Sequence, residues 1–211
     1  MKEELGLYVI TDEEIAGKSH IEIAKEVLEG GARVVQLRDK NKSDREMFEI
    51  AKEMAKLCHA YGAYLIVDDR VDVALASGAD GVHLGPEDIP VFEVRKIAPE
   101  SFIIGATVHS VDEALKAQEE GADYLGVGSV FPTATKRREI VLIGIEGLRE
   151  IVASVTIPVV AIGGIRLEHV EEVLKTGASG IAVCSYLLSQ PDIVEATRRM
   201  KMEIEKMIGL R

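Results

Sequence analysis

A helix-to-strand junction occurs four times in this sequence and narrows its fold more than any other feature. In each copy a glycine and an alanine follow an amphipathic stretch and precede a short apolar run: Gly31-Ala32 before VVQL, Gly78-Ala79 before GVHL, Gly121-Ala122 before YLGV, and Gly177-Ala178 before GIAV. Glycine just past a helix end readily adopts the left-handed backbone conformation that stops the helix. Four copies of one junction therefore indicate a repeated β/α unit.

Eight short apolar runs alternate along the chain with amphipathic segments. The runs span residues 6–11, 34–38, 63–69, 81–85, 102–108, 124–129, 158–165 and 180–184. Between them lie segments such as 45–61, whose apolar residues are spaced as one face of a helix. Runs that are apolar throughout suit strands buried on both faces of a parallel sheet. We therefore predict an α/β fold, a single (β/α)₈ TIM barrel over residues 1–211 that ends in a helix over 192–207.

An open doubly wound sheet is the competing architecture. Such a sheet usually has fewer strands, and a glycine-rich dinucleotide loop commonly follows an early strand. The first run here continues as VITDEE, which contains no glycine. The barrel is therefore the favoured prediction.

The composition argues against several classes of partner. The formal net charge is -11, and an excess of carboxylates repels nucleic-acid phosphates and anionic lipid. No stretch approaches the ~18 uninterrupted apolar residues of a membrane span, and the first residues do not read as a signal peptide. Cys58 and Cys184 lack disulfide-framework or metal-ligand spacing, which suits a reducing compartment. We expect a soluble cytoplasmic protein that binds neither nucleic acid nor membrane.

Polar residues gather where the predicted strands end, which is where the active site of a barrel forms. Gln36, Arg38 and Lys40 alternate after the second run, so an extended chain puts an amide and two cations on one face. These groups can point at one anion. A solvated cluster of charges is the alternative.

Two carboxylates at neighbouring strand ends suggest a metal site. Asp69 and Asp88 follow the third and fourth runs. Carboxylates are hard oxygen ligands that hold Mg²⁺ while leaving positions for substrate phosphates. An ordinary salt bridge from Asp69 to Arg70 or Arg38 is the alternative.

Three further strand-end segments suit a second anionic group. The loop 132–136 offers hydroxyls, backbone amides and one ammonium. Gly163-Gly164 and Cys184-Ser185 follow the seventh and eighth runs, the usual phosphate site of a barrel. A pair of tight turns is the alternative at the glycines, and Ser185 can be a helix N-cap as well as a phosphate ligand. Two anionic groups indicate transfer chemistry between two phosphorylated molecules.

The motifs at these strand ends resemble those of the thiamine phosphate synthase family over essentially the whole chain. They read, in order, YVITD, VVQLRDK, VDDR, GVHLGPED, GATVHS, GVGSVFPTATK, PVVAIGGI and GIAVCS. IGGI-type turns occur in many phosphate-binding barrels, but the motifs are jointly specific. The resemblance implies Mg²⁺-dependent condensation of hydroxymethylpyrimidine diphosphate with hydroxyethylthiazole phosphate, which yields thiamine phosphate and pyrophosphate. It also suggests a homodimer.

The resemblance assigns roles to positions that match the family's motifs. Catalytic roles are implied for Arg38, Lys40, Thr107 and Lys136. Pyrimidine diphosphate binding is implied for Gln36, Arg38, Lys40, Asp68, Thr107 and Lys136. Thiazole phosphate binding is implied for Thr133, Thr135, Gly164, Cys184 and Ser185. The Mg²⁺ ligands implied are Asp69 and Asp88.

The reaction of the family determines which charges these residues must stabilise. The pyrimidine–diphosphate bond breaks largely first, and the thiazole nitrogen captures the stabilised carbocation. The departing pyrophosphate must then be neutralised, which Mg²⁺, Arg38, Lys40 and Lys136 are placed to do. This chain departs from the family pattern at Asp68, where many relatives have Asn, and at Cys184, where they have Ile. A third carboxylate can either weaken the diphosphate contact or draw the metal in more tightly.

Three other functions fit parts of the pattern. The related thiazole tautomerase uses a histidine in a stretch like SVHS, and TVHS at residues 107–110 comes close to it. This makes His109 a candidate acid or base, although a turn-capping or surface role is favoured. Those relatives lack the carboxylate of Asp88 and the QLRxK run. A non-catalytic phosphate-ligand-binding regulator is expected to lose Asp69, Asp88 or Lys136. A sugar-phosphate isomerase or epimerase needs acid–base residues that the pattern does not supply, and His83 is expected to be structural.

Overall fold

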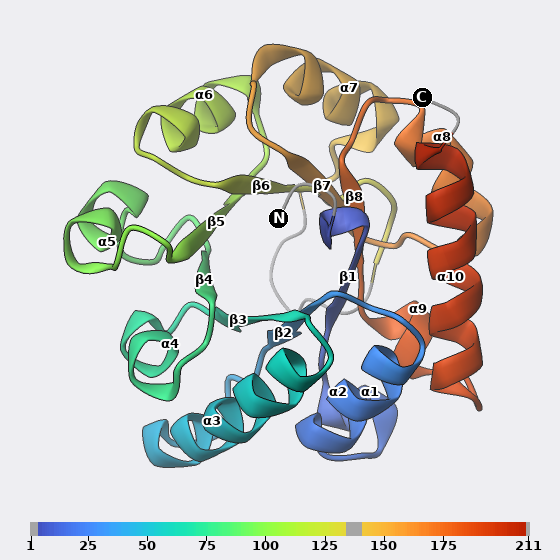
Figure 1. Cartoon of the computed structure of the whole chain (residues 1–211). Coiled ribbons are helices and arrows are strands. Elements are labelled where there is room, and N and C mark those ends of the chain that lie inside the picture. Colours follow the sequence, from blue (N-terminus) through green and yellow to red (C-terminus); the bar gives the residue numbers. More distant parts are fainter. Residues whose placement is uncertain (1–3, 134–140, 210–211) are drawn as a thin grey trace.

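The computed structural model describes residues 4–133 and 141–209 and shows a closed barrel of eight parallel strands in chain order (Figure 1). Each predicted run contains one strand, which confirms the predicted barrel. The strands are β1 Leu7–Ile10, β2 Val34–Leu37, β3 Tyr64–Asp68, β4 Gly81–Leu84, β5 Ile103–Val108, β6 Tyr124–Val127, β7 Val159–Ile162 and β8 Gly180–Val183.

The helices form a ring outside the barrel (Figure 1). They are α1 Glu13–Ala16, α2 His20–Glu29, α3 Asp44–Ala60, α4 Val71–Ser77, α5 Val91–Ile97, α6 Val111–Glu119, α7 Gly144–Ser154, α8 Val170–Leu174, α9 Ser185–Leu188 and α10 Ile193–Ile208, with 3₁₀ turns η1 Glu4–Gly6 and η2 Leu167–His169. The predicted helices over 45–61 and 192–207 correspond to α3 and α10. Asp192 is the N-cap of α10, because its side chain accepts a hydrogen bond from the backbone N–H of Glu195.

The four recurring glycines stop the helices in the predicted way. Gly31, Gly78, Gly121 and Gly177 have φ angles of 99°, 80°, 94° and 98°. These angles lie in the left-handed region, which costs glycine little because it has no Cβ. The turn that follows each glycine leads directly into β2, β4, β6 or β8.

Side chains on each strand alternate between two apolar cores. One set packs between the strands and the surrounding helices, as Val9, Val35 and Leu65 do. The other set fills the inside of the barrel and comprises Leu5, Tyr8, Ile10, Val34, Ile66, Ile103, Tyr124, Val160 and Ala182. Leu5 belongs to η1, which precedes β1, so apolar side chains fill the end of the barrel where the strands begin. The opposite end is left for polar side chains.

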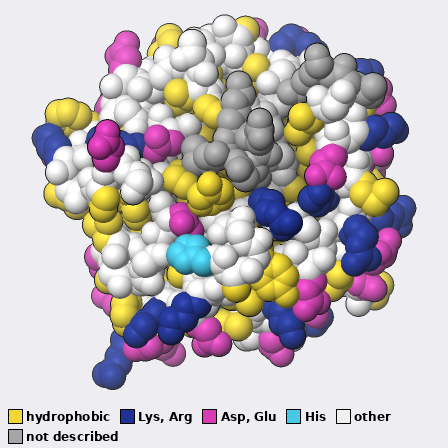
Figure 2. All heavy atoms as spheres, in the orientation of Figure 1, with side chains coloured by type: hydrophobic (Ala, Val, Ile, Leu, Met, Phe, Trp, Pro, Cys, Tyr) yellow, Lys and Arg dark blue, Asp and Glu magenta, His cyan; other side chains and the backbone are white. Residues whose placement is uncertain are grey.

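Charged side chains of both signs are interspersed around the face of the molecule that Figure 2 shows. The excess of carboxylates is therefore not gathered into one acidic patch on this face. Within residues 4–133 and 141–209, no helix combines the length and the apolar character that crossing a membrane requires.

Candidate active site

A network of hydrogen bonds crosses the inside of the barrel, next to the apolar core that fills the end where the strands begin. Gln36, only 3% exposed, donates from Nε2 to the Tyr8 hydroxyl at 2.9 Å. The Tyr8 and Tyr124 hydroxyls lie 2.9 Å apart, and the Tyr124 hydroxyl lies 2.9 Å from His83 Nδ1. His83 Nε2 then lies 2.8 Å from Thr107 Oγ1. Five strands thus contribute one side chain each to a continuous hydrogen-bond network.

The Gln36 side-chain amide begins this network as a hydrogen-bond donor to Tyr8. Either tyrosine hydroxyl can donate to the other, because each carries one hydrogen and also accepts. The tautomer of His83 sets the roles of its two ring nitrogens toward Tyr124 and Thr107. At the ends of the network, the Thr107 hydroxyl can donate or accept, and the Gln36 side-chain carbonyl oxygen is an acceptor. Both ends therefore present polar groups that can hydrogen-bond to a ligand.

Burial keeps both phenols of this network neutral, because it raises the pKa of Tyr8 and of Tyr124 above the usual tyrosine value. Two glycines make room for the rings. A Cβ on Gly105 would overlap the Tyr124 ring, and one on Gly126 would lie 2.8 Å from His83 Cε1. The sequence interpretation of His83 as structural missed its contact with Thr107, and it missed both tyrosines. The sequence pattern that could have revealed both tyrosines is the alternation along each strand, because they occupy inward-facing positions as Gln36 and Thr107 do.

Two cations and two carboxylates pair beside this network. Arg38 Nε lies 3.4 Å and Lys40 Nζ 3.2 Å from the same Asp68 oxygen, and Lys40 also pairs with Asp69. The structure thus brings together Arg38, Lys40 and Asp68 as the sequence predicted. The alternative pairing of Asp69 with Arg70 is wrong.

Arg70 pairs instead with carboxylates outside this group. Its guanidinium lies 2.6 Å from Asp44 and 2.7 Å from Asp72, on the first turns of α3 and α4. Asp69 is left to face Lys40. The cations of the predicted diphosphate site therefore have carboxylate partners of their own.

The two predicted metal ligands end adjacent strands. Asp69 follows β3 with a φ of 58°, an uncommon left-handed conformation for a residue other than glycine, and its N–H donates to the His83 carbonyl oxygen at 2.8 Å. Asp88 follows β4, and its Oδ2 accepts from the Gly85 N–H at 2.6 Å. Each side chain offers carboxylate oxygens, the donor type that Mg²⁺ prefers. The donor type of both side chains fits the predicted ion, and the ion would have to replace Lys40 as the partner of Asp69.

The glycines after β7 lie against the loop after β6. Gly163 and Gly164 have φ angles of 103° and 63°, and the Phe131 N–H donates to the Gly163 carbonyl oxygen at 2.9 Å. A Cβ on Gly164 would lie 2.9 Å from Phe131 Cβ. The close approach of two backbones thus requires glycine here. Thr133 ends the described part of this loop, and the predicted site residues Thr135 and Lys136 lie outside the described residues.

Cys184 and Ser185 begin α9 directly after β8. The expectation that Ser185 is a helix N-cap is wrong, since Cys184 holds the cap position and Ser185 is the first helical residue. Burial and the charge of Asp12 raise the pKa of the Cys184 thiol to about 12, against the opposing effect of Arg38. The thiol therefore stays uncharged and does not repel an anion.

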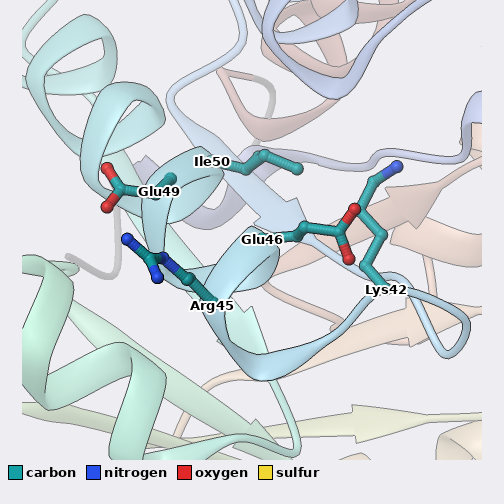
Figure 3. Close-up of a pocket in the computed structure, with 5 residues that line it drawn as sticks. All are labelled: Lys42, Arg45, Glu46, Glu49 and Ile50. Carbon is teal, nitrogen blue, oxygen red and sulfur yellow. The ribbon is translucent and has the colours of Figure 1, made fainter.

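Two other features lie apart from these contacts. The His109 N–H donates to Glu113 Oε2 at 2.7 Å, and its ring Nδ1 lies 3.4 Å from the same oxygen, so Glu113 holds this histidine at the start of α6. A surface depression near the start of α3 contains none of the predicted site residues (Figure 3). Its lining comprises Lys42, Arg45, Glu46, Glu49 and Ile50.

Comparison with known proteins places this site in a family. Residues 7–187 match the family model described as thiamine monophosphate synthase. The chain belongs to the thiamine monophosphate synthase family. A thiamine-phosphate synthase of Pyrococcus horikoshii is 57% identical over 208 residues, 99% of each chain, and one of Pyrococcus abyssi is 53% identical with the same coverage. The solved structure of a thiamine phosphate pyrophosphorylase from Pyrococcus furiosus matches with a TM-score of 0.92 and 52% identity, covering 99% of both chains.

Asp68 is one of the two positions, with Cys184, at which the sequence was expected to depart from the family's motifs. Its carboxylate is only 12% exposed and contacts both Arg38 and Lys40. An asparagine there would keep the oxygen but lose the negative charge. Asp68 thus neutralises cations that an anionic substrate would otherwise meet.

Proposed function

We propose that this chain condenses hydroxymethylpyrimidine diphosphate with hydroxyethylthiazole phosphate to give thiamine phosphate and pyrophosphate. The observation that carries the proposal is the hydrogen-bond network that links Gln36 to Thr107 and lies beside the cations Arg38 and Lys40. A polar heteroaromatic ring suits the first group, and a diphosphate suits the second. The names of the relatives point to the same reaction.

The reaction exchanges one bond for another. The bond between the pyrimidinyl methyl carbon and the diphosphate oxygen breaks, and its electron pair leaves with pyrophosphate. The thiazole nitrogen supplies the electron pair of the new carbon–nitrogen bond. Negative charge therefore grows on the departing oxygens, where Arg38 and Lys40 can stabilise it by charge-assisted hydrogen bonds.

We assign the remaining predicted residues to the same proposal. Asp69 and Asp88 would hold Mg²⁺, which supplies positive charge to the diphosphate when it is bound. Thr107 would donate its hydroxyl hydrogen to the pyrimidine diphosphate, and Lys136 would add a further cation. The thiazole phosphate would lie against Thr133, Thr135, Gly164, Cys184 and Ser185. The predicted homodimer and cytoplasmic location belong to this proposal as well, and the two free cysteines support a reducing compartment.

The test is a pyrophosphate-release assay that supplies both substrates and Mg²⁺ and omits each in turn. We expect release that requires all three and is matched by an equal amount of thiamine phosphate. No release, together with metal-free conversion of one thiazole phosphate isomer into another, would identify a thiazole tautomerase. His109 would then be the first residue to replace.

A further inference from the structure

Asp39 points away from the site that its two neighbours face. Arg38 and Lys40 reach Asp68, whereas the Asp39 carboxylate turns back onto its own loop, residues 38–42. Its Oδ1 accepts from the backbone N–H groups of Asn41 at 2.8 Å and of Lys42 at 3.2 Å. Asp39 thus supplies hydrogen-bond acceptors to a loop that has left the β2 ladder. The conformation of this loop sets where Arg38 and Lys40 lie.

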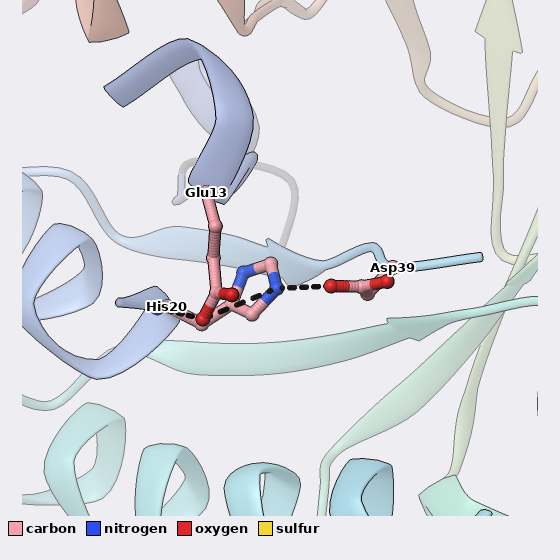
Figure 4. A group of neighbouring side chains, drawn as sticks. All are labelled: Glu13, His20 and Asp39. Carbon is pink, nitrogen blue, oxygen red and sulfur yellow. Dashed lines mark hydrogen bonds and ion pairs between the residues drawn. The ribbon is translucent and has the colours of Figure 1, made fainter. Parts of the chain in front are cut away.

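His20 holds Asp39 from behind. The ring is 1% exposed at the start of α2, and its Nε2 lies 3.1 Å from Asp39 Oδ2 (Figure 4). Its Nδ1 lies 2.8 Å from Thr11 Oγ1, which donates to the Gln36 carbonyl oxygen at 3.1 Å. A carboxylate can only accept, so His20 Nε2 donates to Asp39, while the roles of Nδ1 and the Thr11 hydroxyl depend on the tautomer. His20 thus joins Asp39 to the end of β1.

Glu13 ties the far end of the same loop. Its Oε1 accepts from the His20 backbone N–H at 3.0 Å, and its Oε2 accepts from Lys42 Nζ at 2.7 Å. Hydrogen bonds to Asn41, Lys42 and His20 outweigh the effect of burial and lower the pKa of Asp39. The loop is thus held at Asp39 by His20 and at Lys42 by Glu13, and the end of β2 before it is held at Gln36 by Thr11.

A metal ion is a poor explanation for this cluster. Glu13, His20 and Asp39 place ligand atoms close enough to share an ion. However, the Lys42 ammonium already lies 2.7 Å from Glu13 and 3.7 Å from Asp39. Lys42 therefore supplies the positive charge that an ion would bring.

We propose that His20 and Asp39 are a positioning pair, which holds the loop 38–42 so that Arg38 and Lys40 meet the diphosphate. The side chains of both residues are engaged by Thr11, Asn41, Lys42 and each other, so we expect each to act through its neighbours. The inference rests on the proposed function, because it takes the diphosphate as the ligand of Arg38 and Lys40. A pair with a merely structural role would affect stability without distinguishing between the two substrates.

The test replaces Asp39 by Asn and measures kinetics for each substrate. Asp39→Asn is expected to raise the KM for the pyrimidine diphosphate about tenfold and to lower kcat, because misplaced cations meet the leaving group poorly. The KM for the thiazole phosphate is expected to stay within about twofold. Equal changes for both substrates, or a lowered Tm with unchanged kinetics, would overturn the proposal.

Two variants of His20 separate its two hydrogen bonds. A glutamine amide can reproduce the donor at Nε2, and an asparagine amide can reproduce the polar group at Nδ1. We expect His20→Gln to keep a near-normal KM for the diphosphate and His20→Asn to raise it as Asp39→Asn does. If both variants behave alike, the contact with Asp39 is not what positions the loop. This pair of variants also decides the matter if Asp39→Asn does not fold.

A matched control uses another histidine–aspartate pair. His59 Nε2 lies 3.1 Å from Asp80 on the outer surface, so His59→Gln should leave both KM values unchanged. Calorimetric titration with inorganic pyrophosphate keeps the inference separate from the proposed reaction. If the unaltered protein makes no thiamine phosphate, the reaction fails, but weaker pyrophosphate binding by Asp39→Asn would still support the positioning pair. Equal pyrophosphate binding by the variant and the unaltered protein would refute it.

Discussion

Replacing Asp68 by Asn should strengthen the binding of pyrophosphate. Asp68 Oδ2 lies 3.4 Å from Arg38 Nε and 3.2 Å from Lys40 Nζ, so an incoming anion must compete with the carboxylate for both cations. Asparagine has nearly the same shape and keeps a hydrogen-bond acceptor. The substitution therefore removes the competing charge while leaving the cations in place.

The expected gain follows from the two ion pairs. Arg38 is 29% and Lys40 51% exposed, so water screens both interactions, and each pair contributes about 0.5–1 kcal/mol. Removing both pairs with Asp68 then favours the anion by about 1–2 kcal/mol, which is about a 5- to 30-fold lower Kd, and Lys40 keeps its pair with Asp69 in both proteins. The gain should shrink at high salt, because screening weakens all of these contacts.

Isothermal titration calorimetry with inorganic pyrophosphate in a metal chelator isolates this effect from any bound ion. Asp72→Asn is the matched control, since it breaks the pair with Arg70, which the structure places apart from Arg38 and Lys40. We expect Asp68→Asn to bind more tightly and Asp72→Asn to bind as the unaltered protein does. Unchanged or weaker binding by Asp68→Asn would refute the view that Asp68 competes with the diphosphate.

Three further predictions concern other parts of the site. Tyr124→Phe removes one hydrogen-bond partner each from Tyr8 and His83, and should lower the free energy of unfolding by about 1–3 kcal/mol and raise the KM for the pyrimidine diphosphate; an unchanged urea midpoint would contradict this. Asp88→Ala should abolish Mg²⁺-dependent synthesis yet give a normal far-UV circular dichroism spectrum, whereas substantial activity would exclude Asp88 as a ligand. Burial raises the pKa values of the Cys58 and Cys184 thiols to about 12. Neither thiol should therefore react readily with a disulfide reagent at pH 8 until the protein is unfolded, and rapid reaction of the folded protein would contradict this.

The sequence was sufficient for the barrel because its signals are local. Each glycine of the repeated junction lies next to the strand that it introduces, and its left-handed angle follows from the helix it ends. The grouping of Arg38 and Lys40 was also readable, because alternate residues of an extended chain share a face. Such patterns need no knowledge of which distant segments meet.

The hydrogen-bond network that links Gln36 to Thr107 could not be predicted in the same way. The Tyr8 and Tyr124 hydroxyls that meet in it are separated by 116 positions, and the pairing depends on how the closed barrel aligns its strands. The partners of Asp68, Asp69 and Arg70 likewise depend on side-chain directions after the strands end. Asp69 faces Lys40 rather than Arg70, because the backbone turns at Asp69 into a left-handed conformation that short-range spacing does not reveal.

The central claim is that the buried hydrogen-bond network from Gln36 to Thr107 and the adjacent cations form one binding site for the pyrimidine diphosphate. A crystal structure with thiamine phosphate, pyrophosphate and Mg²⁺ tests it most directly. We predict pyrophosphate on Arg38 and Lys40, the ion on Asp69 and Asp88, and the pyrimidine ring between Gln36 and Thr107. Pyrophosphate bound elsewhere, with Arg38 and Lys40 still paired to Asp68, would contradict the claim.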